Sequence, residues 1–260
     1  MNAPLILRAG TYNLRNGGLD GPRRDDTRLL RQIDMLRDLK LDVLGLQEAK
    51  WGTRSRSRLE HVADQLGMTW RNLVPSNFHG CDLAVLVRES NQMKVTQTRH
   101  LTGPPFVHAH SDVELRINGR DRPIRFMVGH LAPSSAGIRA DEAELVGVYR
   151  GLDVVYVADC NAVGVGENPD TTGVDPYHAA GKLDVRAAEA LQAAGFVDVG
   201  AYVGNTTPTV GHTRAGRLAY RCDRIYTTLP TDTIIGYGVV QEAGEPLSDH
   251  RPVWADFAFP

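Results

Sequence analysis

Two short motifs in the last third of the chain carry side chains suited to acid–base and metal chemistry. Residues 157–161 read Val-Ala-Asp-Cys-Asn and residues 248–252 read Ser-Asp-His-Arg-Pro, each beside a run typical of a β-strand. A carboxylate, a carboxamide and an Asp-His pair at strand ends are the groups that metal-assisted hydrolysis of a phosphate ester requires. The two motifs therefore predict this chemistry.

Further polar residues stand where earlier strands are expected to end. They are Asn13 in Thr-Tyr-Asn-Leu-Arg, Glu48 in Leu-Gln-Glu-Ala, His130 in Val-Gly-His-Leu-Ala-Pro and Asp223 in Cys-Asp-Arg-Ile. Asp159 and Asn161 are two residues apart on an extended segment, so their side chains should point to one side and converge on one phosphate. Asp-x-Asn is also a common turn sequence, but the preceding Val-Val-Tyr-Val favours a strand end.

Taken in order, these motifs resemble those of the endonuclease/exonuclease/phosphatase superfamily, which has the deoxyribonuclease-I-like fold. The resemblance covers residues 5–259. It implies an α+β fold, a four-layer α/β/β/α sandwich of two stacked mixed β-sheets flanked by helices, with the site at one end of the sheets. It also implies a divalent cation, usually Mg²⁺ with Mn²⁺ as an alternative, and direct attack by water without a covalent intermediate.

The resemblance assigns the metal to oxygen ligands. Glu48 matches the principal ligand, Asn13 lies beside it, and Asp249 completes the shell. Mg²⁺ prefers hard oxygen ligands and keeps several waters, so one or two carboxylates are enough to hold it.

The resemblance assigns catalytic roles to the other motif residues. Asp159 and Asn161 orient or deprotonate the attacking water and stabilise the phosphoryl oxygens. Asp223 fixes the tautomer of His250, which acts on the water or holds the phosphate. His130 binds or protonates near the leaving-group oxygen, and such a proton transfer is typically worth roughly 10²–10⁴ in rate.

Three further residues are candidates for substrate binding. Arg54 follows Glu48 in an Arg-rich turn, while His79 and His108 lie in turns of the middle region where relatives contact substrate. A solvated basic loop is the alternative interpretation of the arginines. The long connection over residues 164–182, which includes His178 and Lys182, is expected to form a rim over the site.

The remaining runs supply elements that position these side chains. Strand-like runs cover residues 5–13, 41–47, 70–74, 83–87, 94–101, 113–117, 124–128, 154–157, 224–228, 233–240 and 253–259, and helical spacing covers 26–40, 58–66, 138–149 and 184–194. The runs between 70 and 128 predict a β-meander. Because strands outnumber helices and helices occur in both halves, two stacked sheets with outer helices are favoured over an all-parallel sheet. We expect one domain over residues 1–260.

The net charge, the cysteines and the absence of long apolar runs make some classes of function less favoured. The net charge of −2 gives no overall attraction to polyanions, so nucleic-acid binding would need a local basic patch. The three cysteines form no Cys-x-x-Cys pair, which favours reduced core residues over a disulfide scaffold or a thiolate zinc site. No leader-like N-terminus or long apolar run is present, so we expect a cytoplasmic protein without a membrane partner. The sequence does not define its oligomeric state.

Hydrolysis of phosphodiesters, as in a nuclease acting on DNA or RNA, is the leading functional interpretation. Hydrolysis of phosphomonoesters in a small phosphorylated metabolite is the alternative and suits the acidic composition. A non-catalytic binding protein on the same fold is less favoured, because the metal and imidazole residues are all present. A zinc enzyme using His130 and His250 is also less favoured, because the surrounding ligands are oxygen-rich and no His-x-x-x-His spacing occurs.

Overall fold

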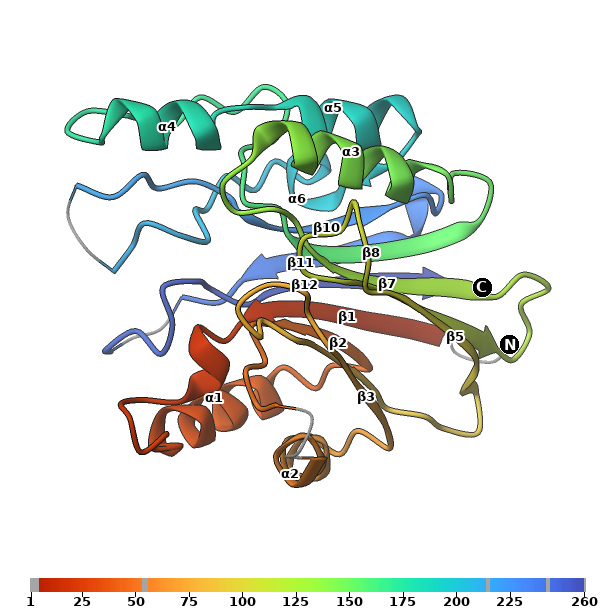
Figure 1. The fold of residues 1–260 in the computed structure, drawn as a ribbon. Coiled ribbons are helices and arrows are strands. Elements are labelled where there is room, and N and C mark those ends of the chain that lie inside the picture. The colour runs from red at the N-terminus through yellow and green to blue at the C-terminus, as the bar shows by residue number, and fades with distance from the viewer. Residues whose placement is uncertain (1–4, 53–55, 214–215, 242–243, 260) are drawn as a thin grey trace.

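The chain forms two stacked β-sheets with helices on both outer faces (Figure 1). This computed structural model describes residues 5–52, 56–213, 216–241 and 244–259. Arg54 lies outside the described residues, so its expected contact with substrate stays a prediction. The four-layer arrangement expected from the sequence is confirmed.

The first sheet has six strands in the order β11-β12-β1-β2-β4-β3. They are β1 (Leu5–Asn13), β2 (Val43–Gln47), β3 (Trp70–Val74), β4 (Leu83–Val87), β11 (Ile234–Val239) and β12 (Val253–Phe259). Only β1 and β2 pair in parallel, and their register places Asn13 opposite Gln47. Glu48, which follows Gln47, therefore lies at the same end of the sheet as Asn13.

The second sheet also has six strands, in the order β5-β6-β7-β8-β10-β9. They are β5 (Met93–Leu101), β6 (His110–Ile117), β7 (Ile124–His130), β8 (Asp153–Asp159), β9 (Val197–Asp198) and β10 (Asp223–Thr227). The parallel pair β7 and β8 places His130 opposite Asp159, and antiparallel β10 places Asp223 on the other side of Asp159. Three motif residues thus stand in one row.

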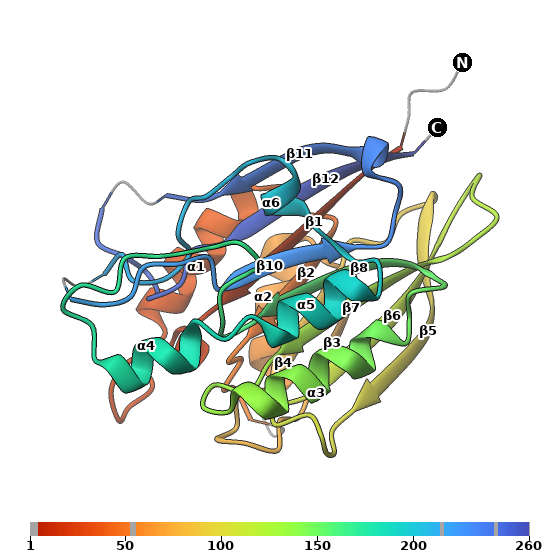
Figure 2. The same ribbon diagram turned by 90° about the horizontal axis from the view of Figure 1, so that it is seen from above.

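Helices cover the outer face of each sheet. They are α1 (Thr27–Asp38) and α2 (Arg56–Leu66) on the first sheet, and α3 (Ala136–Gly147) and α5 (Arg186–Ala193) on the second. In α1, Leu29, Ile33 and Leu36 recur at helical spacing and are buried against the sheet. Seen from above, α3 and α5 lie side by side along the second sheet (Figure 2).

The main core lies between the two sheets and is built from branched and aromatic side chains such as Val85, Phe126 and Val157. The sheets approach closely at Gly45, where a Cβ atom would lie 2.7 Å from side-chain carbons of both Val128 and Val157. The central strands of both sheets are buried on both faces, which explains why their sequences are apolar at nearly every position. No helix among the described residues is long and apolar enough to cross a membrane.

One expectation about the elements is wrong. The meander expected over residues 70–128 is divided, because β3 and β4 pair in the first sheet while β5, β6 and β7 form an antiparallel meander in the second. Strand patterns do not reveal the sheet to which a strand belongs.

The 164–182 connection contains a helix, α4 (Pro176–Lys182), with Pro at its start and the Asp175 side chain accepting from His178 N. Short elements α6 (Val199–Tyr202), η1 (Asn16–Gly18) and η2 (Thr231–Thr233) complete the fold.

Candidate active site

A hydrogen bond between the two sheets marks the centre of the site. Asn13 ends β1 in the first sheet, and its Nδ2 donates to Asp159 Oδ2 at 2.9 Å across the core. Both side chains are buried. Asn13 is held in turn by the Ser248 hydroxyl, which donates to its carbonyl oxygen at 2.8 Å and joins the 248–252 motif to the same place.

Asp159 is contacted by residues from several of the motifs. Its Oδ1 accepts from Asn161 N at 3.0 Å and from the Cys222 thiol at 2.9 Å, and its Oδ2 lies 3.3 Å from His130 Nε2 and 3.8 Å from His250 Nε2. Burial alone would raise the pKa of this carboxyl, but the two imidazoles and the donated hydrogen bonds outweigh burial and lower the pKa well below its usual range. Asp159 is therefore ionised at neutral pH.

His250 is oriented by the neighbouring strand. Its Nδ1 lies 2.9 Å from Asp223 Oδ2, which leaves Nε2 directed toward Asp159 and the cavity described below. Burial opposes a charged ring, but Asp223 and Asp159 more than compensate and raise the pKa of His250 to about 10. The Asp223–His250 pair expected from the sequence is thus in contact.

His130 lies on the other side of Asp159 and is buried. Burial outweighs the attraction of Asp159 and lowers the pKa of His130 to about 4, so this ring is neutral near pH 7. The ring stacks on His108 with centroids 4.0 Å apart, and His108 Nδ1 lies 3.1 Å from the Ser76 hydroxyl. His108 is only 2% exposed and packs against the buried ring of His130. Its expected contact with substrate stays a prediction.

Asn161 and Lys182 form the other wall of the site. Asn161 follows β8 with a left-handed φ of 52°, donates from Nδ2 to Leu131 O at 3.0 Å, and accepts at Oδ1 from Lys182 Nζ at 2.7 Å. Lys182 Nζ also donates to Pro133 O at 2.9 Å. Burial lowers the pKa of Lys182, and among the described residues no carboxylate pairs with it. The third N–H of its ammonium group is left for a ligand.

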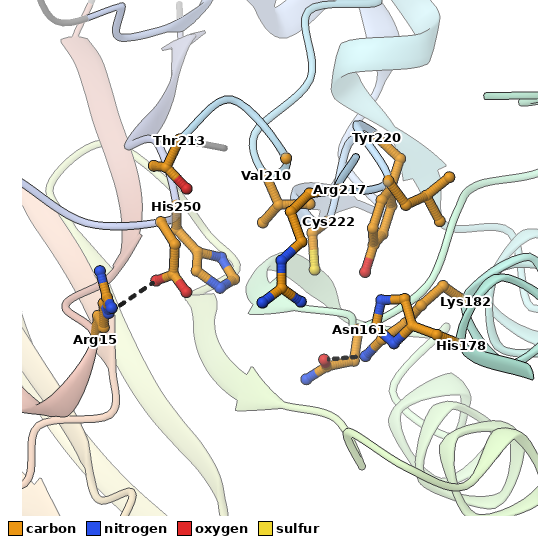
Figure 3. Close-up of a pocket in the computed structure, with 13 residues that line it drawn as sticks. Arg15, Asn161, His178, Lys182, Val210, Thr213, Arg217, Tyr220, Cys222 and His250 are labelled. Carbon is orange, nitrogen blue, oxygen red and sulfur yellow. Dashed lines mark hydrogen bonds and ion pairs between the residues drawn. The ribbon is translucent and has the colours of Figure 1, made fainter. Parts of the chain in front are cut away.

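A cavity of about 370 Å³ opens beside these residues (Figure 3). It is lined by Arg15, Asn161, His178, Lys182, Val210, Gly211, Thr213, Arg217, Leu218, Tyr220, Cys222, Asp249 and His250. Positive charge prevails in this lining, because Asp249 is the one acidic side chain among these residues. The cavity therefore suits an anionic ligand.

The expected metal ligands lie at the end of the first sheet. Glu48 follows β2 with a left-handed φ of 54°, and its Oε2 accepts from Asn16 N at 2.9 Å. Asn13 Oδ1 accepts from Arg15 N at 2.9 Å, and Asp249 is half-exposed with an oxygen 4.0 Å from Arg15 Nε. Carboxylate and carboxamide oxygens are hard donors, so this set fits Mg²⁺ or Mn²⁺ with water completing the shell.

The expected residue His79 does not line the cavity, and two residues that do were missed. His79 is exposed in a turn and packs edge-on against Phe78, with ring centroids 3.9 Å apart. Cys222 was interpreted as an ordinary core residue, although it contacts Asp159 and lines the cavity. Its position directly before Asp223 was the available signal. Arg217 has no sequence signal, because the loop that carries it reaches the site only through the fold.

A family model described as the endonuclease/exonuclease/phosphatase family matches residues 10–250. The chain belongs to this family. Its members are hydrolases that act on phosphate esters, and the match includes every candidate site residue from Asn13 to His250. Comparison with curated protein sequences gives no match.

Solved structures of family members share the fold at low identity. A family protein from Bacteroides vulgatus has a TM-score of 0.71 at 16% identity, covering 98% of this chain and 100% of that one. A mannosyl-6-phosphatase from Bacteroides thetaiotaomicron has a TM-score of 0.65 at 18% identity, covering 96% and 98%. TDP2 from D. rerio, in complex with a single-stranded DNA product, has a TM-score of 0.66 at 16% identity, covering 97% and 98%.

Proposed function

We propose that this protein hydrolyses phosphodiester bonds by direct attack of water, with Mg²⁺ or Mn²⁺ as cofactor. The observation that carries the proposal is the gathering of Asn13, His130, Cys222 and His250 around the ionised Asp159, beside a cationic cavity. A carboxylate and two imidazoles around one point are suited to orienting water and moving a proton. The cavity beside them is suited to the phosphate.

Glu48 and Asn13 are the residues proposed to hold the cation, with Asp249 nearby. A bound cation there would offset the charge of the phosphoryl oxygens and favour ionisation of a water. The contact of Asn13 Nδ2 with Asp159 links this metal site to the catalytic carboxylate.

Each polar side chain has a proposed task. Asp159 orients the attacking water, and Asn161 with Lys182 donates hydrogen bonds to the phosphoryl oxygens. His250, with its Nδ1 held by Asp223, presents Nε2 to the same phosphate. His130, neutral and held against His108, acts near the leaving-group oxygen.

Substrate contacts are proposed for the cationic lining. Arg217 and His178 lie across the cavity from His250, and among the described residues neither forms an ion pair. Exposed, unpaired basic groups are available for phosphate oxygens. His79, Arg54 and His108 remain further candidates from the sequence.

A phosphomonoesterase that acts on a small phosphorylated metabolite is the second candidate. The cavity of about 370 Å³ has the size of a small-ligand pocket rather than of a groove for a duplex. The family includes both types, since the structures compared above include one solved with DNA and one named a sugar phosphatase.

A substrate panel with controlled metal tests the proposal. Protein freed of metal by chelation is assayed with Mg²⁺, Mn²⁺ or neither on plasmid DNA, single-stranded DNA, RNA, abasic duplex, bis(p-nitrophenyl) phosphate, nucleotides and sugar phosphates. We expect no activity without metal and the highest kcat/KM on a diester. A preference for monoesters would select the second candidate, and full activity in chelator would contradict the metal requirement.

A further inference from the structure

Cys222 is a potential metal ligand to which the proposed hydrolysis gives only a hydrogen bond to Asp159. One donor atom each from Asp159, Cys222 and His250 lie within 4.8 Å of one another, and this is the one such group of His, Cys, Asp or Glu found in the described part of the chain. The sulfur atom also faces the cavity (Figure 3), so an ion can reach it. Thiol, imidazole and carboxylate form a softer donor set than the oxygens proposed for Mg²⁺.

The orientation of His250 suits metal binding through Nε2. Metal-ligating histidines almost always donate their other ring N–H to a carboxylate or carbonyl. Here Nδ1 lies 2.9 Å from Asp223, while Nε2 lies 3.8 Å from Asp159 Oδ2. Two ligand atoms of a tetrahedral zinc ion lie about 3.4 Å from each other when each zinc–ligand bond is about 2.05 Å long. Only a small approach of the two side chains is needed.

We propose that Asp159, Cys222 and His250 form a binding site for Zn²⁺ that is distinct from the Mg²⁺ site and blocks catalysis when filled. Zinc binds Cys, His and Asp side chains in tetrahedral geometry, and the cavity leaves the fourth position to water. Mg²⁺ does not compete for Cys222, because it avoids thiolate sulfur. The inhibition, but not the binding, rests on the proposed function.

Binding exchanges protons for the metal. The Zn–S bond forms as the S–H bond of Cys222 breaks, and the thiol proton passes to solvent. A second bond forms between zinc and His250 Nε2 as the N–H bond there breaks, and this proton also passes to solvent. Two buried carboxylates, Asp159 and Asp223, then face the dication and offset its charge. Asp159 and His250 are no longer free to act on water or phosphate.

Metal binding can be measured directly without any substrate. Co²⁺ is used as a coloured substitute for Zn²⁺, and the thiolate-to-cobalt absorption band reports the bond to sulfur; Zn²⁺ affinity follows by calorimetry. We expect the band in the wild-type protein and its loss in Cys222→Ser and Cys222→Ala. Zinc affinity should fall by at least about 100-fold, because even residues that only orient ligands change metal affinity by roughly 10–100-fold.

Cys81→Ser is the matched control, since Cys81 is also a buried free cysteine. It should keep both the band and the affinity. Absence of the band in folded wild-type protein, equal zinc affinity in the Cys222 variants, or a band that depends on Cys81 would overturn the site.

Inhibition is measured on the best substrate of the panel in excess Mg²⁺. We expect Zn²⁺ to inhibit wild type and Cys81→Ser, and to inhibit the Cys222 variants only at roughly 100-fold higher concentration. Bound zinc without inhibition would overturn the blocking role. A protein that binds zinc through Cys222 yet hydrolyses no substrate would contradict the proposed function instead.

Discussion

Asp159 shows how a buried carboxylate is kept charged in a protein core. The residue is 1% exposed, and its charge is stabilised by donors from β1, β7, the turn after β8 and the residue before β10. A buried charge without such partners would neutralise or destabilise the fold. The same contacts hold the carboxylate at a fixed position, which orientation of a water molecule requires.

Lys182 gives a prediction at this scale. Its ammonium group holds the Asn161 carboxamide and faces the cavity, so Lys182→Met should lower kcat/KM by roughly tenfold or more through loss of a charge-assisted hydrogen bond to the phosphate. Steady-state kinetics measure the effect. Lys94→Met, an exposed lysine on β5, is the control and should change kcat/KM less than about twofold. Equal kinetics for both variants would remove Lys182 from the substrate site.

The sequence predicted the site residues that belong to recognisable motifs. Asp159, Asp223 and His250 were expected together and are in contact. Arg217 and Cys222 were not expected, because their roles depend on how a loop folds back and on which side of β10 a side chain faces. The ring stack of His108 on His130 was also beyond the sequence, since the segment before β6 must fold against the end of β7 to create it.

Two buried side chains of helix α3 form hydrogen bonds with the segments that carry the site residues. Glu142 accepts from Val107 N at 2.8 Å and from Ala132 N at 2.7 Å, which ties the segment before β6 to the segment after His130. Arg139, also buried, donates to Ala132 O and to Gly181 O beside Lys182. Two polar residues on the buried face of one helix thus connect three loops around the site.

Burial of Glu142 leads to a prediction about stability and pH. Desolvation raises its pKa from 4.5 to about 7, so the stabilisation contributed by the neutral acid is present below pH 4.5 and is lost as the pH rises through 7. The free energy of unfolding of wild type, relative to Glu142→Gln, should therefore fall by about 3 kcal/mol across this range. Urea unfolding at several pH values measures it.

Glu144→Gln is the control for this experiment. Glu144 is exposed on the same helix, so its substitution should leave the pH dependence of stability close to that of wild type. If Glu142→Gln gave the same pH dependence as wild type, ionisation of Glu142 would not be coupled to folding.

Each sheet has one parallel strand pair at its centre, and each pair ends at the site. In the first sheet β1 and β2 end at Asn13 and Gln47, with Glu48 next; in the second, β7 and β8 end at His130 and Asp159. Stacking the two sheets face to face brings these ends together. The proposed catalytic groups are therefore far apart in the chain and still lie close together.

Close approach of the sheets at Gly45 predicts a sensitive position. Gly45→Ala places a methyl group against Val128 and Val157, so overpacking should lower the free energy of unfolding by about 1–3 kcal/mol. Gly137→Ala on α3 is the control, because its Cβ meets nothing within 4 Å and alanine favours helix. Thermal unfolding of both variants tests this, and unchanged stability of Gly45→Ala would show that the sheets can separate freely.

Most of the architecture followed from strand and helix patterns together with the family resemblance. The strands at 5–13, 70–74, 83–87 and 253–259 have the expected bounds. The assignment of strands to sheets did not follow, because long-range pairing places β4 in the first sheet and β5 in the second, and local sequence does not specify that pairing. Helix α4 was missed because its seven residues are too few to show a hydrophobic repeat at helical spacing.

Asp159→Asn is the most direct test of the proposed catalytic centre. Its kcat with Mg²⁺ is measured on the best substrate of the panel, beside wild type and Asp34→Asn, an exposed control on α1. Near-equal melting temperatures of the three proteins establish that the variants are folded. We predict that kcat falls by at least about 10² for Asp159→Asn and stays within about twofold for Asp34→Asn. Wild-type kcat in folded Asp159→Asn would contradict the account.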